Sequence, residues 1–364
     1  MCRLPWGLPA VRFCGVLKRV PLLVAMLAVA GISLAFGPAG EQDYAWKLTP
    51  TGSDARLRGL SAVSARVAWT SGSAGTVLRT QDAGDSWENV SPPDTGGLQF
   101  RDIEAFDADH AVILSIGEGE DSRIYVTSDG GLHWTLTFVN EDPNAFYDCM
   151  TFFNRRHGLA LSDPVDGRFR IIATDDGGDS WRVVDADMPA ALPGEFAFAA
   201  SGQCLVSAGG RRAWFATGGG AQARVFRSDD RGQSWEVSAT PIRSGPSAGI
   251  FALAFRNQRH GLAVGGDFAV PTQAPDALAL TEDGGATWNL VDDAPNEYRS
   301  GAAWIDGRAA IVVGPTGSDV SGNRGRSWQR FDEGSFDTVD CARGGACWAS
   351  GERGRVARLV KRDD

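Results

Sequence analysis

The sequence predicts an all-β fold, a seven-bladed β-propeller, and three observations support this prediction. An eight-residue motif, Ser/Thr-x-Asp-x-Gly-x-x-Trp, occurs six times, with Asn in place of Asp in the last copy. The motif tryptophans therefore lie 47, 47, 54, 53 and 40 positions apart, at Trp87, Trp134, Trp181, Trp235, Trp288 and Trp328. This spacing is typical of propeller blades. Short runs rich in β-branched and aromatic residues also flank the copies, as strands require.

Each motif is predicted to form the turn of a β-hairpin. A short carboxylate accepts hydrogen bonds from backbone N–H groups of its own turn, and the Gly supplies a positive φ that other residues resist. The Trp opens the next strand and packs between neighbouring sheets. The turn is too short to supply the oxygen ligands of a calcium loop, so no metal is expected. The residues assigned this structural role are Asp82, Asp129, Asp176, Asp230, Asp283 and Asn323.

Ring closure follows from counting strands. Six motifs close six blades, and the runs 337–342, 346–350 and 354–359 supply only three strands of a seventh. The run 45–49 near the other end has no blade of its own, and its Trp46 resembles a motif tryptophan. We expect this N-terminal strand to complete the last blade, because closure removes exposed sheet edges. The blade that spans 196–235 is longer and predicts an inserted strand or a widened loop.

The first 37 residues differ from the rest of the chain. Four basic residues precede an uncharged apolar run from Pro21 to Gly37, followed by small residues. This pattern predicts a secretory signal, with an uncleaved N-terminal anchor as the alternative. The expected organisation is a leader at 1–37, a linker at 38–43, a propeller at 44–361 and a tail at 362–364. The protein is therefore expected to be exported, to the periplasm or outside the cell, or tethered to a membrane by the leader.

Charge and motifs exclude several function classes. The chain has 35 basic and 45 acidic residues, and the leader holds four of the basic ones and no acidic ones. The remaining 31 basic residues give a net charge of −14, without a basic run, which argues against nucleic-acid binding. No phosphate loop, dinucleotide fingerprint or zinc-protease motif occurs, so no cofactor is expected. We expect a monomer.

Four cysteines follow the leader: Cys149, Cys204, Cys341 and Cys347. Cys341 and Cys347 flank a predicted turn and could form a disulfide across one hairpin in an oxidising compartment. Buried free thiols are an equally good interpretation. The spacing does not resemble a zinc site.

The six motifs resemble the Asp-box, or bacterial neuraminidase repeat, of sialidases, some glucan-cleaving glycosidases and non-catalytic propellers. The resemblance covers residues 44–360, and the blade pattern is most similar to the photosystem II assembly and stability factors. Their pattern, a strand ending in Gly before the motif, is seen in 260–266 and 309–314. This resemblance implies a seven-bladed propeller and a non-catalytic scaffold that holds a membrane-protein intermediate.

Candidate binding residues lie where the innermost strands begin, on the face opposite the motif turns. Aligning these strand starts places one polar residue from each of five blades in a common column: Arg58, Arg101, Asp148, Arg299 and Asp337. Aromatic residues precede four of them, among them Tyr147 and Tyr298. The loops after the second strands add Asp163 and Asp267. The column predicts a binding site at the channel mouth, although polar residues at strand starts are ordinarily just solvated.

Two functions compete for this site. Arginines, aromatics and carboxylates are typical of protein interfaces, which favours a docking surface for a protein partner, such as an envelope or membrane protein. The alternative is a glycoside hydrolase with a carbohydrate ligand. A sialidase requires three arginines and a Tyr–Glu pair, for which Arg58, Arg101 and Arg299 with Tyr298 are candidates. A glucan hydrolase requires two carboxylates across a cleft, for which Asp148 and Asp163 are the best pair. We favour the non-catalytic scaffold.

Overall fold

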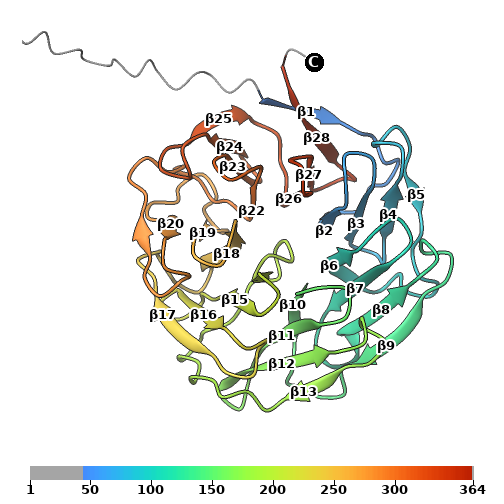
Figure 1. Ribbon diagram of the computed structural model, residues 1–364, viewed down its shortest axis with the longest axis horizontal. Helices are drawn as coiled ribbons and strands as arrows, with labels where there is room; N and C mark the ends of the chain where they lie inside the picture. Colours follow the sequence, from blue (N-terminus) through green and yellow to red (C-terminus); the bar gives the residue numbers. More distant parts are fainter. Residues whose placement is uncertain (1–43, 363–364) are drawn as a thin grey trace, which may run out of the picture. The chain divides into compact units, whose positions relative to one another are not determined.

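The computed structural model describes residues 44–362 and confirms the predicted seven-bladed propeller (Figure 1). Seven four-stranded antiparallel sheets surround a central channel. In the first six blades the first strand of the sheet lies nearest the channel, whereas the N-terminal strand of the chain lies at the outer edge of the seventh. The predicted leader, the linker and the last two residues of the tail lie outside the described residues. No helix in residues 44–362 has the length and apolar character needed to cross a membrane.

The first four blades follow the chain in order. Blade 1 contains β2 (Leu57–Ala62), β3 (Ala68–Gly72), β4 (Val77–Thr80) and β5 (Glu88–Asn89). Blade 2 contains β6 (Gln99–Ala105), β7 (Ala111–Ile116), β8 (Arg123–Thr127) and β9 (Thr135–Val139), with the 3-10 turn η1 (Gly119–Asp121). Blade 3 contains β10 (Tyr147–Phe152), β11 (Gly158–Val165), β12 (Arg168–Thr174) and β13 (Arg182–Val184). Blade 4 contains β14 (Leu205–Ala208), β15 (Arg212–Ala216), β16 (Arg224–Ser228) and β17 (Glu236–Ala239).

The last three blades complete the ring. Blade 5 contains β18 (Ala248–Phe255), β19 (Gly261–Asp267), β20 (Leu278–Thr281) and β21 (Asn289–Leu290). Blade 6 contains β22 (Gly301–Trp304), β23 (Ala310–Gly314), β24 (Gly317–Ser321) and β25 (Gln329–Asp332). Blade 7 contains β26 (Thr338–Cys341), β27 (Cys347–Ser350), β28 (Val356–Lys361) and the N-terminal β1 (Tyr44–Leu48).

Strand β1 closes the ring as predicted. It pairs antiparallel with β28, with Trp46 opposite Leu359. Trp46 is buried against Phe336, at 5.3 Å between ring centroids, and its indole N–H donates to Ser318 Oγ at 2.9 Å. The strand therefore covers the edge of blade 7 and contacts blade 6. All 28 strands of the described ring lie within the compact unit 41–364, so this part of the chain carries the complete fold.

Apolar packing between blades holds the ring together. Seven buried clusters each join two neighbouring blades, and the motif tryptophans contribute to these interfaces. Trp87 of blade 1, for example, packs edge-on against Trp348 of blade 7 at 5.9 Å. An eighth cluster, around Phe198 and Phe251, lies at the channel instead of between two sheets.

The six motif turns share one hydrogen-bond pattern. In the third copy, Thr174 Oγ1 accepts from Gly178 N at 2.9 Å and donates to Asp176 Oδ1 at 2.7 Å. Ser180 donates to the same carboxylate through its backbone N–H, at 3.0 Å, and its hydroxyl, at 2.5 Å. Asn323 reproduces the pattern in the sixth copy, with its amide donating to Ser327 Oγ at 2.8 Å. These bonds pair the polar groups of the turn internally.

The two ends of the ring are distinguished by the turns that they carry. The box face carries the motif turns and the turns between the first and second strands of each blade. The entry face carries the starts of the innermost strands and the loops between the second and third strands. Blade 4 has the ordinary four strands, so its extra length is a widened connection, residues 185–204, that precedes β14 on the entry face.

Two disulfides are present in the ring. Cys341 and Cys347, directly opposite each other in β26 and β27, are bonded across the hairpin. Cys149 in β10 and Cys204 just before β14 form a second bond, a pairing that the spacing in sequence left open. This second disulfide joins blades 3 and 4 beside the channel.

Candidate functional site

Several innermost strands begin with a β-bulge, which places one extra residue at the channel mouth. The pairing register shifts at this point in blades 1, 2, 3 and 5. A bulge re-aims the extra side chain and bends the strand. The residues at these bulges are Arg58, Arg101, Asp148 and Phe251. In blade 7, Asp337 N bonds to Ser350 O while Thr338 already faces Ser350, so Asp337 holds the equivalent position.

Three guanidinium groups gather at one side of this mouth. Arg56, Arg58 and Arg101 line a cavity of about 490 Å³ together with Asp337. Arg56 binds both oxygens of Asp337, at 2.8 and 2.6 Å, and Arg58 lies 3.8 Å from the same carboxylate. Arg101 donates to the carbonyl of Ala199 at 2.8 Å. Among the charged residues of the cavity lining, three cations thus face a single anion.

The electrostatics of Arg58 and Arg101 indicate that these two cations are not neutralised, whereas the hydrogen bonds to Asp337 raise the pKa of Arg56. Burial, reinforced by the positive charges of Arg58 and Arg56, lowers the pKa of Arg101 to about 10. Burial also lowers the pKa of Arg58, with a smaller contribution from Arg56. The buried Nε of Arg58 has no hydrogen-bond partner. A donor that is buried and unpaired costs free energy, and an anionic ligand would relieve that cost.

Aromatic side chains form the other side of the cavity. Phe198 stacks on Phe251 with 3.9 Å between ring centroids, and Tyr298 meets the edge of Phe251 at 4.8 Å. Phe268 meets both of these rings edge-on, with ring centroids 6.3 Å from Phe198 and 6.1 Å from Phe251. Its side chain is 52% exposed. Pro271 and Pro315 complete this wall. The cavity therefore offers cations on one side and an apolar, partly exposed surface on the other.

A segment from blade 4 crosses the channel and forms the floor of the site. Gln203 Nε2 donates to the carbonyls of Ala302 in blade 6 and Val339 in blade 7, at 2.9 and 2.8 Å. Gly202 has φ +74°, and a Cβ there would lie 2.5 Å from the Asp102 carboxylate of blade 2. In Figure 1 this segment is the yellow-green loop that reaches the centre of the ring. The segment fixes Phe198 and the carbonyl of Ala199 where the arginines converge.

Arg299 does not reach the cavity, which corrects the predicted column. Its side chain is completely buried, where it bonds to Asp319 at 2.7 Å and Thr316 at 2.9 Å. Arg299 N bonds to Gly265 O as Leu57 N bonds to Gly351 O and Phe336 N to Gly314 O. Arg299 thus occupies the buried position that precedes the bulge, one residue out of the aligned column. A shift of one residue turns a side chain to the other face of a strand.

The remaining predicted residues divide between the mouth and the interior. Tyr298 lines the cavity, whereas Tyr147 is buried against Phe138 at 5.2 Å. Burial raises the pKa of Tyr147 to about 12. Asp267 accepts from the backbone of Ala269 at 2.9 Å in its own loop and is not among the lining residues.

Asp148 and Asp163 are in direct contact instead of facing each other across a cleft. Burial, together with the charge of Asp163, raises the pKa of Asp148 well above its ordinary value. Burial raises the pKa of Asp163 to about 7, while its Oδ1 accepts from Ala197 N at 2.8 Å. Burial thus favours the protonated form of both carboxyl groups. The two carboxyl groups leave no room for a sugar between them.

Sequence reasoning missed Arg56, Phe198, Phe251 and Phe268. Phe251 had a signal, because the start of β18 belongs to the same column as the other innermost strands. Arg56 is equivalent to Tyr298, because each is the residue directly before the buried position that Leu57 and Arg299 occupy. Phe198 comes from the non-repeated connection and has no counterpart in other blades. Among residues 44–362, no cluster of three His, Cys, Asp or Glu side chains has the arrangement of a metal site.

The comparisons with known proteins give two classes of relatives. No protein-family model matches the chain. Photosystem II stability/assembly factor HCF136 of Arabidopsis thaliana is 23% identical over 260 residues, which cover 68% of this chain and 59% of that protein. Xyloglucanase Xgh74A of Acetivibrio thermocellus is 24% identical over 256 residues, 60% of this chain and 29% of the enzyme. The chain thus spans less than two thirds of the length of either relative.

A solved structure of YCF48 bound to a D1 peptide superposes with a TM-score of 0.64 and 14% identity. The match covers 86% of this chain and 96% of the YCF48 chain. At this identity the likeness concerns the propeller fold.

Proposed function

We propose that this protein is a non-catalytic propeller that binds a polypeptide segment at its channel mouth. Arg58 and Arg101 bind a carboxylate of the partner, while Phe198, Phe251 and Phe268 bind an adjacent apolar side chain. The observation that carries the proposal is the composition of one cavity: three guanidinium groups against one carboxylate, beside a stacked aromatic wall. Arginine forks and aromatic surfaces are the usual anchors of protein interfaces.

The relatives support the same class of function. HCF136 is a stability and assembly factor by name, and YCF48 has been seen with a peptide. We further propose that the protein is exported and that its partner is an envelope or membrane protein. The apolar run at 21–37 and the two disulfides support this compartment, since disulfides persist where thiols are oxidised.

Glycoside hydrolysis is the second candidate, favoured by the likeness to a xyloglucanase. The site offers little to this chemistry. Asp148 and Asp163 are buried neighbours whose pKa values are both raised, and Arg299 is buried against Asp319, away from any arginine triad. We therefore expect no turnover of xyloglucan or sialosides by the purified protein.

Peptide binding can test the proposal. The probes are short peptides that end in Phe-Glu, with a free or an amidated C-terminus, measured by calorimetry against the domain 41–364. We expect Arg58→Gln with Arg101→Gln to weaken binding at least about 100-fold, because hydrogen bonds to charged groups contribute roughly 1.5–3 kcal/mol each and the variant removes two arginines. Phe251→Ala should weaken the contact with the Phe of the peptide and leave the contact with its carboxylate unchanged.

Arg168→Gln is the matched control, since Arg168 is exposed on the entry face and does not line the cavity. Equal losses in the control and in the double variant would contradict the site assignment. Hydrolysis of xyloglucan that disappears in Asp148→Asn would instead establish the enzyme. Capture from envelope extracts with the same variants would then identify the natural partner.

A further inference from the structure

One position on the box face carries arginine in nearly every blade. In six blades, one hydrogen bond joins the motif turn to the turn between the first two strands. Its donor is the backbone N–H of the third residue after the motif Ser or Thr, and its acceptor is a backbone carbonyl in the turn between the first two strands. This bond marks equivalent positions, and they are occupied by Arg66, Asp109, Arg156, Arg211, Arg259 and Arg308. Arg343 lies in the corresponding turn of blade 7, which has no motif. The six arginines are exposed, and together we call them the arginine collar.

The collar arginines are not neutralised by the protein itself. Neighbouring arginines form ion pairs, such as Arg155 with Asp107 at 2.8 Å and Arg212 with Asp229 at 2.6 Å. Within residues 44–362, no carboxylate lies within 4.0 Å of a collar guanidinium. The carboxylates of this face belong mostly to the motif turns, which lie farther from the axis. A positive ring thus exists on a domain whose net charge is negative.

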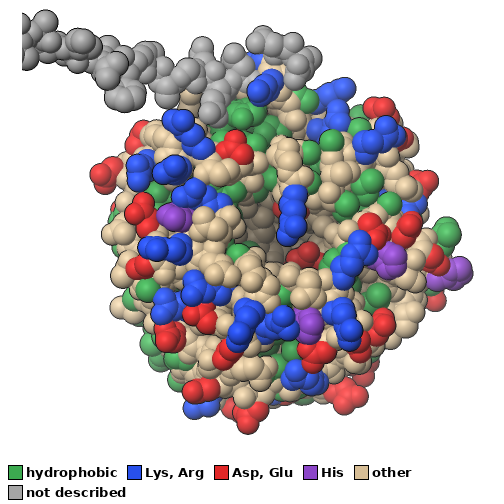
Figure 2. Space-filling model, in the orientation of Figure 1, with side chains coloured by type: hydrophobic (Ala, Val, Ile, Leu, Met, Phe, Trp, Pro, Cys, Tyr) green, Lys and Arg blue, Asp and Glu red, His purple; other side chains and the backbone are tan. Residues whose placement is uncertain are grey.

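Figure 2 shows this face of the ring. All four histidines of the chain lie in box-face turns, and histidine side chains are visible in this view. Lys and Arg side chains gather around the central hollow, and most of the Asp and Glu side chains lie toward the periphery. The seven turns present these cations on one broad surface, as contact with an extended anionic surface requires.

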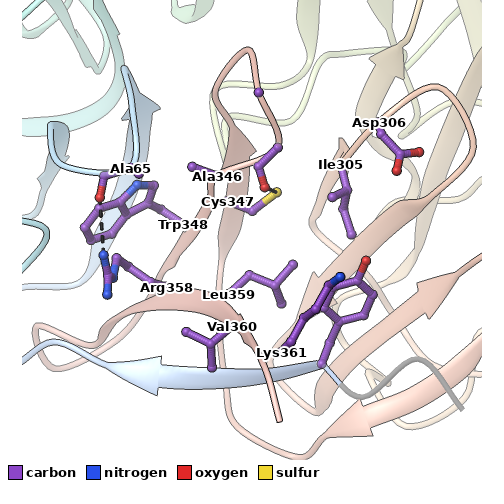
Figure 3. Close-up of a pocket in the computed structure, with 13 residues that line it drawn as sticks. Ala65, Ile305, Asp306, Ala346, Cys347, Trp348, Arg358, Leu359, Val360 and Lys361 are labelled. Carbon is purple, nitrogen blue, oxygen red and sulfur yellow. Dashed lines mark hydrogen bonds between the residues drawn. The ribbon is translucent and has the colours of Figure 1, made fainter. Parts of the chain in front are cut away.

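The chain enters the ring at the same face. Tyr44 begins β1 opposite Lys361, the last residue of β28, and both line a cavity with Ile305 of the box-face turn in blade 6 (Figure 3). Only the six residues 38–43 separate Tyr44 from the apolar run 21–37, and six extended residues span at most about 20 Å.

The cavity beside Tyr44 is amphipathic. It measures about 900 Å³, with Ile305, Leu359 and Val360 among its lining residues. Figure 3 shows Arg358 and Lys361 among the residues that line this cavity. The Arg358 guanidinium donates to the carbonyl of Ala65 at 3.3 Å. The apolar walls are thus flanked by two cations and by the carboxylate of Asp306, a mixed lining that an amphipathic lipid could contact.

We propose that the box face docks on an anionic lipid bilayer through the arginine collar. Basic residues near such a surface each contribute about 1 kcal/mol, and a ring of six acts together. The entry face, with its peptide site, then points away from the lipid. Nucleic acid is the competing anionic partner. A membrane is favoured because only residues 38–43 connect the apolar run 21–37 to the first strand of the ring. The proposal is independent of the proposed peptide site.

Vesicle binding of the domain 41–364, which contains the complete ring, can test this. The probes are vesicles of phosphatidylcholine with about a third phosphatidylglycerol, compared with pure phosphatidylcholine. We expect sedimentation with the anionic vesicles only, and loss of binding at high salt. The fourfold variant R66Q/R156Q/R211Q/R259Q should bind at least about tenfold more weakly, in line with the contribution of each basic residue.

The fourfold variant R123Q/R168Q/R243Q/R353Q removes the same charge from the entry face and should bind the vesicles as the unmodified domain does. Thermal melts check that both variants are folded, and the collar variant should keep its affinity for the peptide. Absence of vesicle binding, or equal loss in both variants, would overturn the proposal. Tighter binding to a single-stranded oligonucleotide than to the vesicles, lost in the collar variant, would assign the face to nucleic acid instead.

Discussion

At the scale of residues, the Asp148–Asp163 pair shows how burial decides chemistry. Two carboxyl groups in contact cannot both ionise in a buried site, so one proton stays between them. The same pair in a solvated cleft would be a candidate for acid–base catalysis. Here Asp163 also accepts the backbone N–H of Ala197 and so holds the channel segment next to Arg101. The pair therefore supports the floor of the binding site.

Folding of this pair is coupled to proton uptake, which predicts a pH dependence. The folded pKa of Asp163, about 7, lies above the ordinary value near 3.9, so the stabilisation is complete below about pH 4 and is lost as the pH rises through 7. We expect the free energy of unfolding to fall by about 2–4 kcal/mol between pH 5 and 8.

Asp163→Asn keeps an oxygen that can accept from Ala197 N but has no proton to exchange, so the fall should largely disappear in this variant. Urea unfolding at several pH values measures the difference. Parallel pH profiles for the two proteins would show that Asp163 is not the group that titrates.

At the scale of elements, the motif turn is a self-contained unit. Its carboxylate is paired with hydroxyl and N–H groups of the same turn, so each copy forms without help from other blades. In the fifth copy, hydrogen bonds from Thr287 and Thr281 outweigh burial and lower the pKa of Asp283 to about 2. Asn323 provides the same acceptor without charge, which shows that the turn requires the oxygen more than the negative charge.

Replacing Asp176 by Ala should leave the donors of Ser180 and Thr174 unpaired and lower stability by about 1–3 kcal/mol. Asp176→Asn should cost much less, as the sixth copy indicates. Chemical denaturation of both variants, with peptide binding as the second measurement, tests this. Unchanged stability of the Ala variant, or lost peptide binding with normal stability, would contradict a purely structural role.

At the scale of the whole molecule, stability depends on closing the ring. Strand β1 is the outer strand of blade 7 and brings Trp46 into the apolar cluster between blades 6 and 7. An open ring would expose the edge of β28 to other chains. The seven clusters are similar, so the interface that contains the two chain ends is the one most easily opened.

Deleting residues 38–50 should lower the melting temperature by about 10 °C or more and promote aggregation, because it removes a buried Trp and exposes the edge of β28. Deleting only 38–43 leaves β1 in place and serves as the control. Differential scanning calorimetry and light scattering follow both effects. A monomeric, equally stable 38–50 deletion would show that blade 7 closes without β1.

The sequence alone determined the ring, its seven blades, its closing strand and its motif turns, because these depend on local patterns that recur in every blade. It also located the channel mouth and identified Arg58, Arg101 and Tyr298 there. Tertiary structure decided the rest. Arg299 is buried because it stands one residue before the position that faces the channel mouth, and Phe198 reaches the site through a connection that no other blade repeats. The arginine collar has no run in the sequence, since its members lie a blade apart and gather only when the ring closes.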